Sequence, residues 1–76
     1  MKKKYFLAMW GIDDNGDDYL LMETKEFDTI RETIDFSKAL NLNVGTANTY
    51  IELCGAEYDE AEVCVNQYVI EMLQRN

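Results

Sequence analysis

Four aspartates crowd one short stretch of the chain, and they are the side chains whose spacing most strongly suggests chemistry. They flank a central Asn-Gly dipeptide and are Asp13, Asp14, Asp17 and Asp18. A hard cation such as Ca²⁺ would offset the repulsion between these carboxylates. The spacing does not match an EF-hand loop, because aligning Gly16 with the invariant glycine places Gly11 at the first ligand position and Met22 at the last. We therefore expect a solvated or partner-contacting acidic loop and no metal site.

The other reactive side chains are two cysteines, Cys54 and Cys64. The chain has no histidine, so a Cys–His pair, a Ser–His–Asp triad and most zinc sites are excluded. Seventy-six residues also leave little space for a pocket of about 300 Å³ or more. We therefore expect no enzymatic activity and no cofactor. The cysteines are expected to be small apolar side chains of a sheet rather than a disulfide.

Charge is unevenly distributed along the chain. Fifteen acidic residues face seven basic ones, which gives a net charge of −8. Five acids and no base lie between Tyr5 and Thr24, and six acids and no base lie between Ala39 and Gln74. Such a surface repels nucleic-acid phosphates and anionic lipid, and it attracts basic surfaces within a Debye length of about 8–10 Å. We expect a basic protein as the partner, with no direct contact to nucleic acid or membrane. A charge that serves only solubility stays open.

The first residues resemble a signal peptide, because Lys2–Lys4 precede the apolar run Tyr5–Ile12. The run is short, no small-residue cleavage site follows it, and an acidic loop comes directly after it. No stretch approaches the roughly 20 apolar residues of a membrane span. With two cysteines and no secretory signal, the cytoplasm is the expected location.

The chain, residues 1–76, is long enough for a single domain only. The apolar run 4–12 and the segment 18–25 predict a β-hairpin, since Asn-Gly is the strongest short signal for a two-residue type I′ turn. That turn places Ile12 opposite Tyr19 and Trp10 opposite Leu21. Trp10 and Tyr19 would then share one face of the sheet.

A helix is predicted over Glu26–Asn43. Asp28 or Thr29 can cap it, and Thr29 with Glu32 fits a capping box. After the helix, Thr49–Ala56 and Glu62–Ile70 predict a second hairpin that turns about Asp59.

Two structures are compatible with the segment that follows Asp59, a strand of a second hairpin or a helix. Its predicted register places Cys54 opposite Cys64 and Leu53 opposite Val65. The alternative is a C-terminal helix that is capped within Asp59–Glu62. The expected fold is α+β, a two-layer β-β-α-β-β arrangement of antiparallel hairpins packed on one helix, with β-β-α-β-α as the alternative. The two acidic turns are expected at opposite ends of the sheet, because the helix makes a parallel crossover.

One helix covers only one face of such a sheet, so an apolar face remains open. Together with the acidic turns, this favours binding to a protein. The expected partner-binding residues are the acids of the two turns and two aromatic residues: Asp13, Asp14, Asp17, Asp18, Glu57, Asp59, Glu60, Glu62, Trp10 and Tyr19. We expect an inhibitor that occupies a basic nucleic-acid-binding groove of its partner. The alternative is a small homo-oligomer, for example a homodimer, that pairs its open face with itself.

In size, charge and lack of active-site chemistry, the chain resembles the small acidic proteins that phages and mobile elements make against host defences, anti-CRISPR proteins among them. This resemblance is one of type and rests on no motif. It implies a nucleic-acid-binding enzyme as the partner and the cytoplasm of the host cell as the location.

Overall fold

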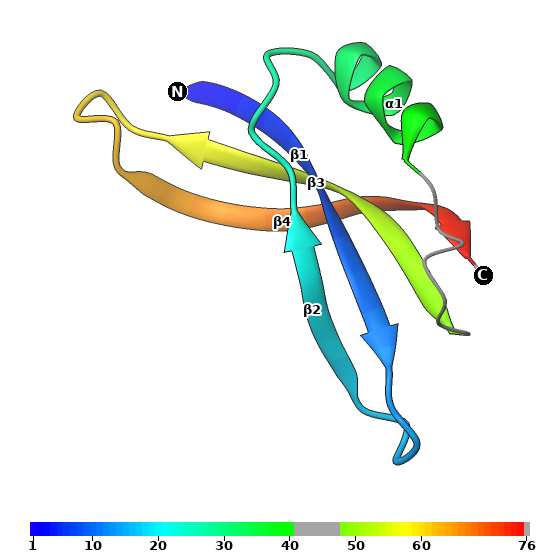
Figure 1. Ribbon diagram of the computed structural model, residues 1–76. Coiled ribbons are helices and arrows are strands. Elements are labelled where there is room, and N and C mark those ends of the chain that lie inside the picture. The colour runs from blue at the N-terminus through cyan, green and yellow to red at the C-terminus, as the bar shows by residue number, and fades with distance from the viewer. Residues whose placement is uncertain (41–47, 76) are drawn as a thin grey trace.

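The computed structural model describes residues 1–40 and 48–75, which form one antiparallel sheet in the order β2-β1-β3-β4 with one helix (Figure 1). The elements are β1 (Lys2–Ile12), β2 (Asp18–Glu23), α1 (Ile30–Ala39), β3 (Thr49–Tyr58) and β4 (Cys64–Arg75). The expected α+β order β-β-α-β-β is confirmed. The alternative C-terminal helix is wrong, because β4 pairs with β3 along its length. The β-branched and aromatic composition of this segment decides in favour of a strand.

Strands β2 and β3 run parallel to each other, since both pair antiparallel with the central strand β1. The helix carries the chain from one to the other. The β1–β2 loop and the β3–β4 loop therefore lie at opposite ends of the sheet, as expected (Figure 1).

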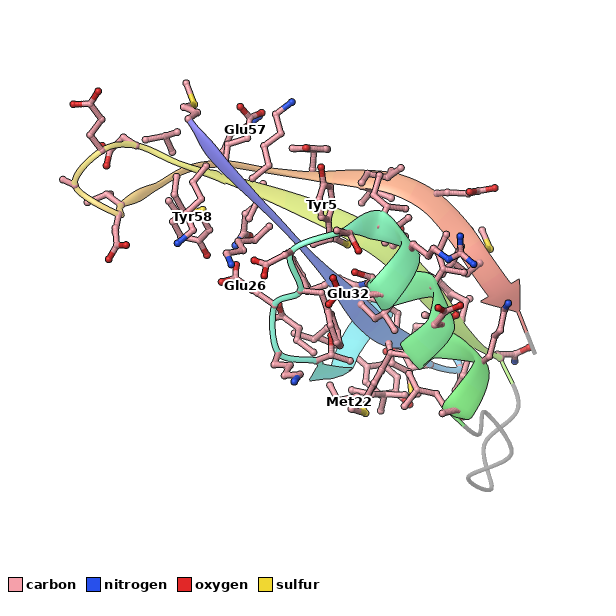
Figure 2. The ribbon with its side chains drawn as sticks, turned by 90° about the horizontal axis from the view of Figure 1, so that it is seen from above. Tyr5, Met22, Glu26, Glu32, Glu57 and Tyr58 are labelled. Carbon is pink, nitrogen blue, oxygen red and sulfur yellow. The ribbon has the colours of Figure 1, made fainter. Side chains whose placement is uncertain are left out.

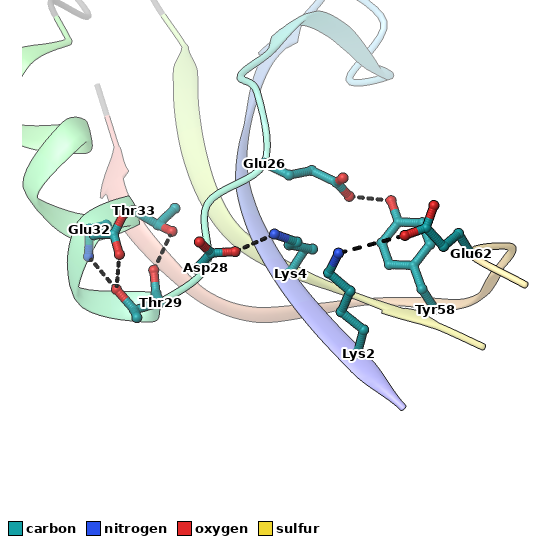
Figure 3. Close-up of polar contacts among 9 residues, drawn as sticks. All are labelled: Lys2, Lys4, Glu26, Asp28, Thr29, Glu32, Thr33, Tyr58 and Glu62. Carbon is teal, nitrogen blue, oxygen red and sulfur yellow. Dashed lines mark hydrogen bonds and ion pairs between the residues drawn. The ribbon is translucent and has the colours of Figure 1, made fainter. Parts of the chain in front are cut away.

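Helix α1 begins at a single well-defined cap. The Thr29 hydroxyl accepts from the backbone N–H of Glu32 at 3.1 Å and lies 3.0 Å from the Glu32 carboxylate (Figure 3). The predicted start at Glu26 is wrong, because the backbone of Phe27 pairs with Tyr5 of β1 and is therefore extended. At the other end Leu40 has extended backbone angles, and the predicted residues 41–43 lie outside the described residues. No helix in the described residues is long and apolar enough to cross a membrane.

The helix lies over one face of the sheet, which we call the helix face (Figures 1 and 2). Its apolar core consists of Leu7, Met9, Ile51 and Leu53, with Ile34, Leu40 and Leu73 packed against them. The opposite side, the open face, has its own buried cluster of Phe6, Ala8, Cys54 and Ala56, flanked by Trp10 and Tyr58. No helix of residues 1–40 and 48–75 covers this second cluster, and the sheet itself shields it.

β-Bulges in the two edge strands bend the sheet. The β3–β4 register shifts three times, so that Val65, Ile70 and Leu73 of β4 have no paired residue in β3. The β1–β2 register shifts once, which leaves Leu21 unpaired. A bulge bends its strand and increases the local twist. The edge strands therefore bend and twist relative to β1 and β3.

The register of the first hairpin differs from the predicted one. Ile12 pairs with Asp18, Gly11 with Tyr19 and Trp10 with Leu20, each one residue away from the expected partner. The cause is a loop of three residues, 14–16, between the hydrogen-bonded Asp13 and Asp17, where two were predicted. The register shift at Leu21 then brings Met9 opposite Met22, as a two-residue turn would also have placed it.

The register of the second hairpin was also predicted wrongly. Cys54 pairs with Val69, and Cys64 pairs with Tyr58, so the two cysteines do not face each other. Both thiols are free, with Cys54 buried and Cys64 exposed. The predicted turn was centred on Asp59, whereas Asp59 is the first residue of the loop, and the bulges of β4 add a further offset.

Candidate protein-binding surface

The first acidic loop, residues 13–17, is organised by the side chain of Asp13. The backbone N–H of Asp13 donates to Asp17 O at 2.9 Å, and Gly16 N donates to Asp13 O at 3.0 Å. The Asp13 carboxylate accepts from the backbone N–H groups of Asn15 and Asp17, both at 2.9 Å. This carboxylate therefore has a structural role, because it satisfies two donors that the turn leaves unpaired.

The second acidic loop, residues 59–63, repeats this arrangement. Asp59 N donates to Val63 O and Glu62 N donates to Asp59 O, both at 3.0 Å. The Asp59 carboxylate accepts from Ala61 N at 2.9 Å and from Val63 N at 3.0 Å. The Asp59 carboxylate therefore also stabilises its loop.

Three more of the predicted binding acids have intramolecular partners. The Tyr50 hydroxyl donates to Asp18 at 2.7 Å, and Asn66 Nδ2 donates to Glu57 at 3.5 Å. Glu62 forms an ion pair with Lys2 at 3.9 Å (Figure 3). The carboxylates that remain available are Asp14, Asp17 and Glu60, which are exposed and have no hydrogen bond or ion pair to the described residues.

The lysines of the N-terminus gather at the end of the sheet that carries the second loop. Lys4 contacts Asp28, and the Tyr58 hydroxyl donates to Glu26 (Figure 3). The hydrogen bond between Lys4 and Asp28 raises the pKa of the lysine and lowers the pKa of the aspartate. The bond to Glu26 raises the pKa of Tyr58 to about 12.

The two predicted aromatic residues lie on opposite faces, so the expectation that they share a face is wrong. Trp10 is half-buried on the open face, beside the Phe6 cluster. Tyr19 lies on the helix face, where its ring covers Gly11; a Cβ at Gly11 would lie 2.6 Å from that ring. The three-residue loop causes this, because it pairs Tyr19 with Gly11 instead of Ile12.

The open face also holds a groove that the sequence did not predict. Its volume is about 320 Å³, larger than expected for so short a chain. The floor comes from β1 and β3 and the walls from β2 and β4: Phe6, Ala8, Trp10, Leu20, Glu23, Glu52, Cys54, Gln67, Tyr68 and Val69. Glu23 and Glu52 are its only charged residues. A lone glutamate within the apolar run Tyr50–Cys54 is a feature of the sequence that was not interpreted as part of a site.

The pKa of Cys54, which lies on the groove floor, depends on burial and on the charges nearby. Burial, together with the negative charges of Glu52 and Glu23, raises the pKa of Cys54 to about 11. The two glutamates therefore disfavour a negative charge at the groove floor, whereas burial disfavours a charge of either sign there.

Among the residues described, no three His, Cys, Asp or Glu side chains lie close enough to hold a metal ion. No protein-family model, no curated protein and no solved structure matches the chain.

Proposed function

We propose that this chain is a non-enzymatic protein-binding domain that occupies a basic, nucleic-acid-binding surface of its partner. The loop carboxylates stand where phosphates would otherwise bind. The observation that supports this most is the set Asp14, Asp17 and Glu60, three exposed acids whose carboxylates have no hydrogen bond or ion pair to the described residues, carried by loops at opposite ends of the sheet. A net charge of −8 would steer such a domain toward a basic surface.

The size of the molecule agrees with this role. Its extents are 42 × 26 × 16 Å, so its long axis matches about 12 base pairs at 3.4 Å per base pair. A rigid sheet that presents acids at both ends offers two contacts to one extended basic groove. Inhibitors of this kind from phages or mobile elements, anti-CRISPR proteins for example, would act in the cytoplasm of the host cell.

A competition experiment tests the proposal. The immobilised chain is loaded with bacterial lysate at low salt, and bound proteins are eluted with duplex DNA or with a salt gradient. We expect proteins with basic DNA-binding surfaces, released by DNA and by moderate salt, because ionic contacts weaken steeply as salt rises.

Two variants with equal charge change provide the control. The double variant Asp14→Asn/Asp17→Asn should lose most of the DNA-displaceable protein. The variant Asp35→Asn/Glu71→Gln neutralises two acids outside the loops and should retain it. Equal losses in both variants, or capture that DNA does not displace, would contradict the proposal.

A second candidate is the homo-oligomer, favoured by the open face, which the one helix described leaves uncovered, and by the exposed apolar side chains of β4. Val65, Val69 and Met72 are each more than half exposed. Sedimentation at increasing concentration would show a dimer, and Val69→Glu should split it. A monomer at high concentration excludes this candidate.

A further inference from the structure

The groove on the open face combines an apolar floor with two unpaired carboxylates. Phe6, Ala8 and Cys54 line the floor and are each less than 10 % exposed. Glu23 projects from β2 and Glu52 from β3, and neither carboxylate has a hydrogen bond or ion pair to the described residues.

The strand register brings these two carboxylates to the same side of the sheet. Ala8 pairs with Glu23 on one side and with Glu52 on the other. Two strand spacings separate them, which corresponds to about 10 Å between their backbones. A cation held above Ala8 would therefore lie between both side chains.

From this arrangement we propose that the groove binds a single lysine or arginine side chain of a partner protein. The aliphatic stem of such a side chain would pack on Phe6 and Ala8, and its charged end would lie between Glu23 and Glu52. The indole of Trp10, which also lines the groove, adds an aromatic surface that favours a cation. This inference rests on the proposed function, because it specifies which kind of side chain of the basic partner the groove would bind.

The negative charge of the groove disfavours the other molecules that could occupy an apolar groove. A second copy of the chain would bring a further net charge of −8 and two more carboxylates to the groove. An anionic lipid or a free phosphate would meet Glu23 and Glu52 without a compensating base among the lining residues. The volume of about 320 Å³ is at the lower limit for a small-molecule site and suits one long side chain.

Trp10 makes the proposal directly measurable, because it is the only tryptophan. The probes are three blocked pentapeptides, Gly-Gly-X-Gly-Gly, in which X is arginine, lysine or norleucine. Norleucine keeps the aliphatic stem and lacks the charge. We expect the two basic peptides to change the Trp10 fluorescence and to shift the backbone amide signals of residues 6–10 and 52–54. The norleucine peptide should bind at least about tenfold more weakly.

Matched variants separate the groove from the general charge. Glu23→Gln/Glu52→Gln should weaken binding of the arginine peptide about tenfold, whereas Asp35→Asn/Glu71→Gln, with the same change in charge, should alter it less than about twofold. Unchanged melting temperatures confirm that both variants are folded. Equal weakening in both variants, or equal binding of norleucine, would overturn the proposal.

The same titration tests the groove and the proposed function separately. Amide shifts confined to the acidic loops would refute the groove as the binding site and leave the proposed function standing. No binding of either basic peptide at low salt would refute the groove and weaken the proposed function with it.

Discussion

Gly16 and Glu62 occupy the same position in two loops of the same form, with backbone φ angles of 85° and 61°. Both residues donate their N–H to the aspartate that opens the loop. This left-handed conformation suits glycine, whereas it costs other L-residues roughly 1–2 kcal/mol. The first loop thus has the residue that its geometry favours, and the second does not.

Replacing Glu62 by glycine should therefore stabilise the protein. We expect a gain of about 0.5–1 kcal/mol in the free energy of unfolding, since the relief of strain exceeds the entropy cost of a new glycine. The exposed ion pair with Lys2 that is lost contributes little. Urea denaturation measures the change. Glu60→Gly is the control and should give no gain, and a loss of stability in Glu62→Gly would contradict the assignment.

The aspartates that open the loops should matter more than their neighbours. Asp13→Ala and Asp59→Ala each remove the acceptor of two backbone N–H groups, so each should cost about 1 kcal/mol. Asp13→Asn keeps an acceptor oxygen and should cost less. Asp14→Ala should stay within about 0.5 kcal/mol of the parent protein in the same urea titration. An equal cost for Asp13→Ala and Asp14→Ala would show that the hydrogen bonds do not hold the loop.

Local patterns were sufficient to predict the elements and failed to predict their register. The cap at Thr29 and the hairpin near Gly16 depend on residues close in sequence, and both were found. A glycine with positive φ suits a two-residue turn and a three-residue loop alike, however. In the three-residue loop the Asp13 carboxylate accepts from two backbone N–H groups, and these hydrogen bonds favour it over a two-residue turn. The longer loop shifts the register and places Tyr19 on the face opposite to the predicted one.

The groove could not be predicted for a different reason. Glu23 and Glu52 lie far apart in the sequence and come together only because Ala8 pairs with both. The β1–β3 register that makes this possible is a long-range property, and bulges at the edges adjust it further.

The two cysteines should differ sharply in reactivity. Cys54 is buried, and its pKa of about 11 leaves only about 0.1 % thiolate at pH 8. Cys64 is exposed. Iodoacetamide at pH 8 should therefore add one group to the folded chain, at Cys64, and two groups in urea. Mass spectrometry counts the groups, and Cys64→Ala should be inert while folded. Rapid native labelling of Cys54 would contradict its placement on the groove floor.

Tyr58 should make the protein sensitive to alkali. Its pKa rises from 10.0 in the free side chain to about 12 in the fold, because the neutral hydroxyl donates to Glu26. The unfolded chain therefore loses this proton first, and the contribution of Tyr58 is complete below pH 10 and disappears as pH rises through 12.

Thermal melts of the parent protein and of Tyr58→Phe test this. The variant should be less stable at neutral pH, and the difference between the two proteins should shrink from pH 10 to pH 12. Lys4 and Cys54 titrate in both proteins and cancel in the comparison. A difference that does not depend on pH would exclude the bond to Glu26 as its cause.

The central position of β1 has a consequence for how the chain folds. Each hairpin joins neighbouring segments, but the β1–β3 ladder joins residues 2–11 with residues 49–58. Closing the long connection costs chain entropy before the central contacts form, so this ladder should limit the folding rate. A truncation of Leu53 in the centre should then slow folding, whereas loss of the Asp59 acceptor should mainly speed unfolding. Stopped-flow kinetics would reveal whether the sheet assembles from two preformed hairpins that join along β1 and β3.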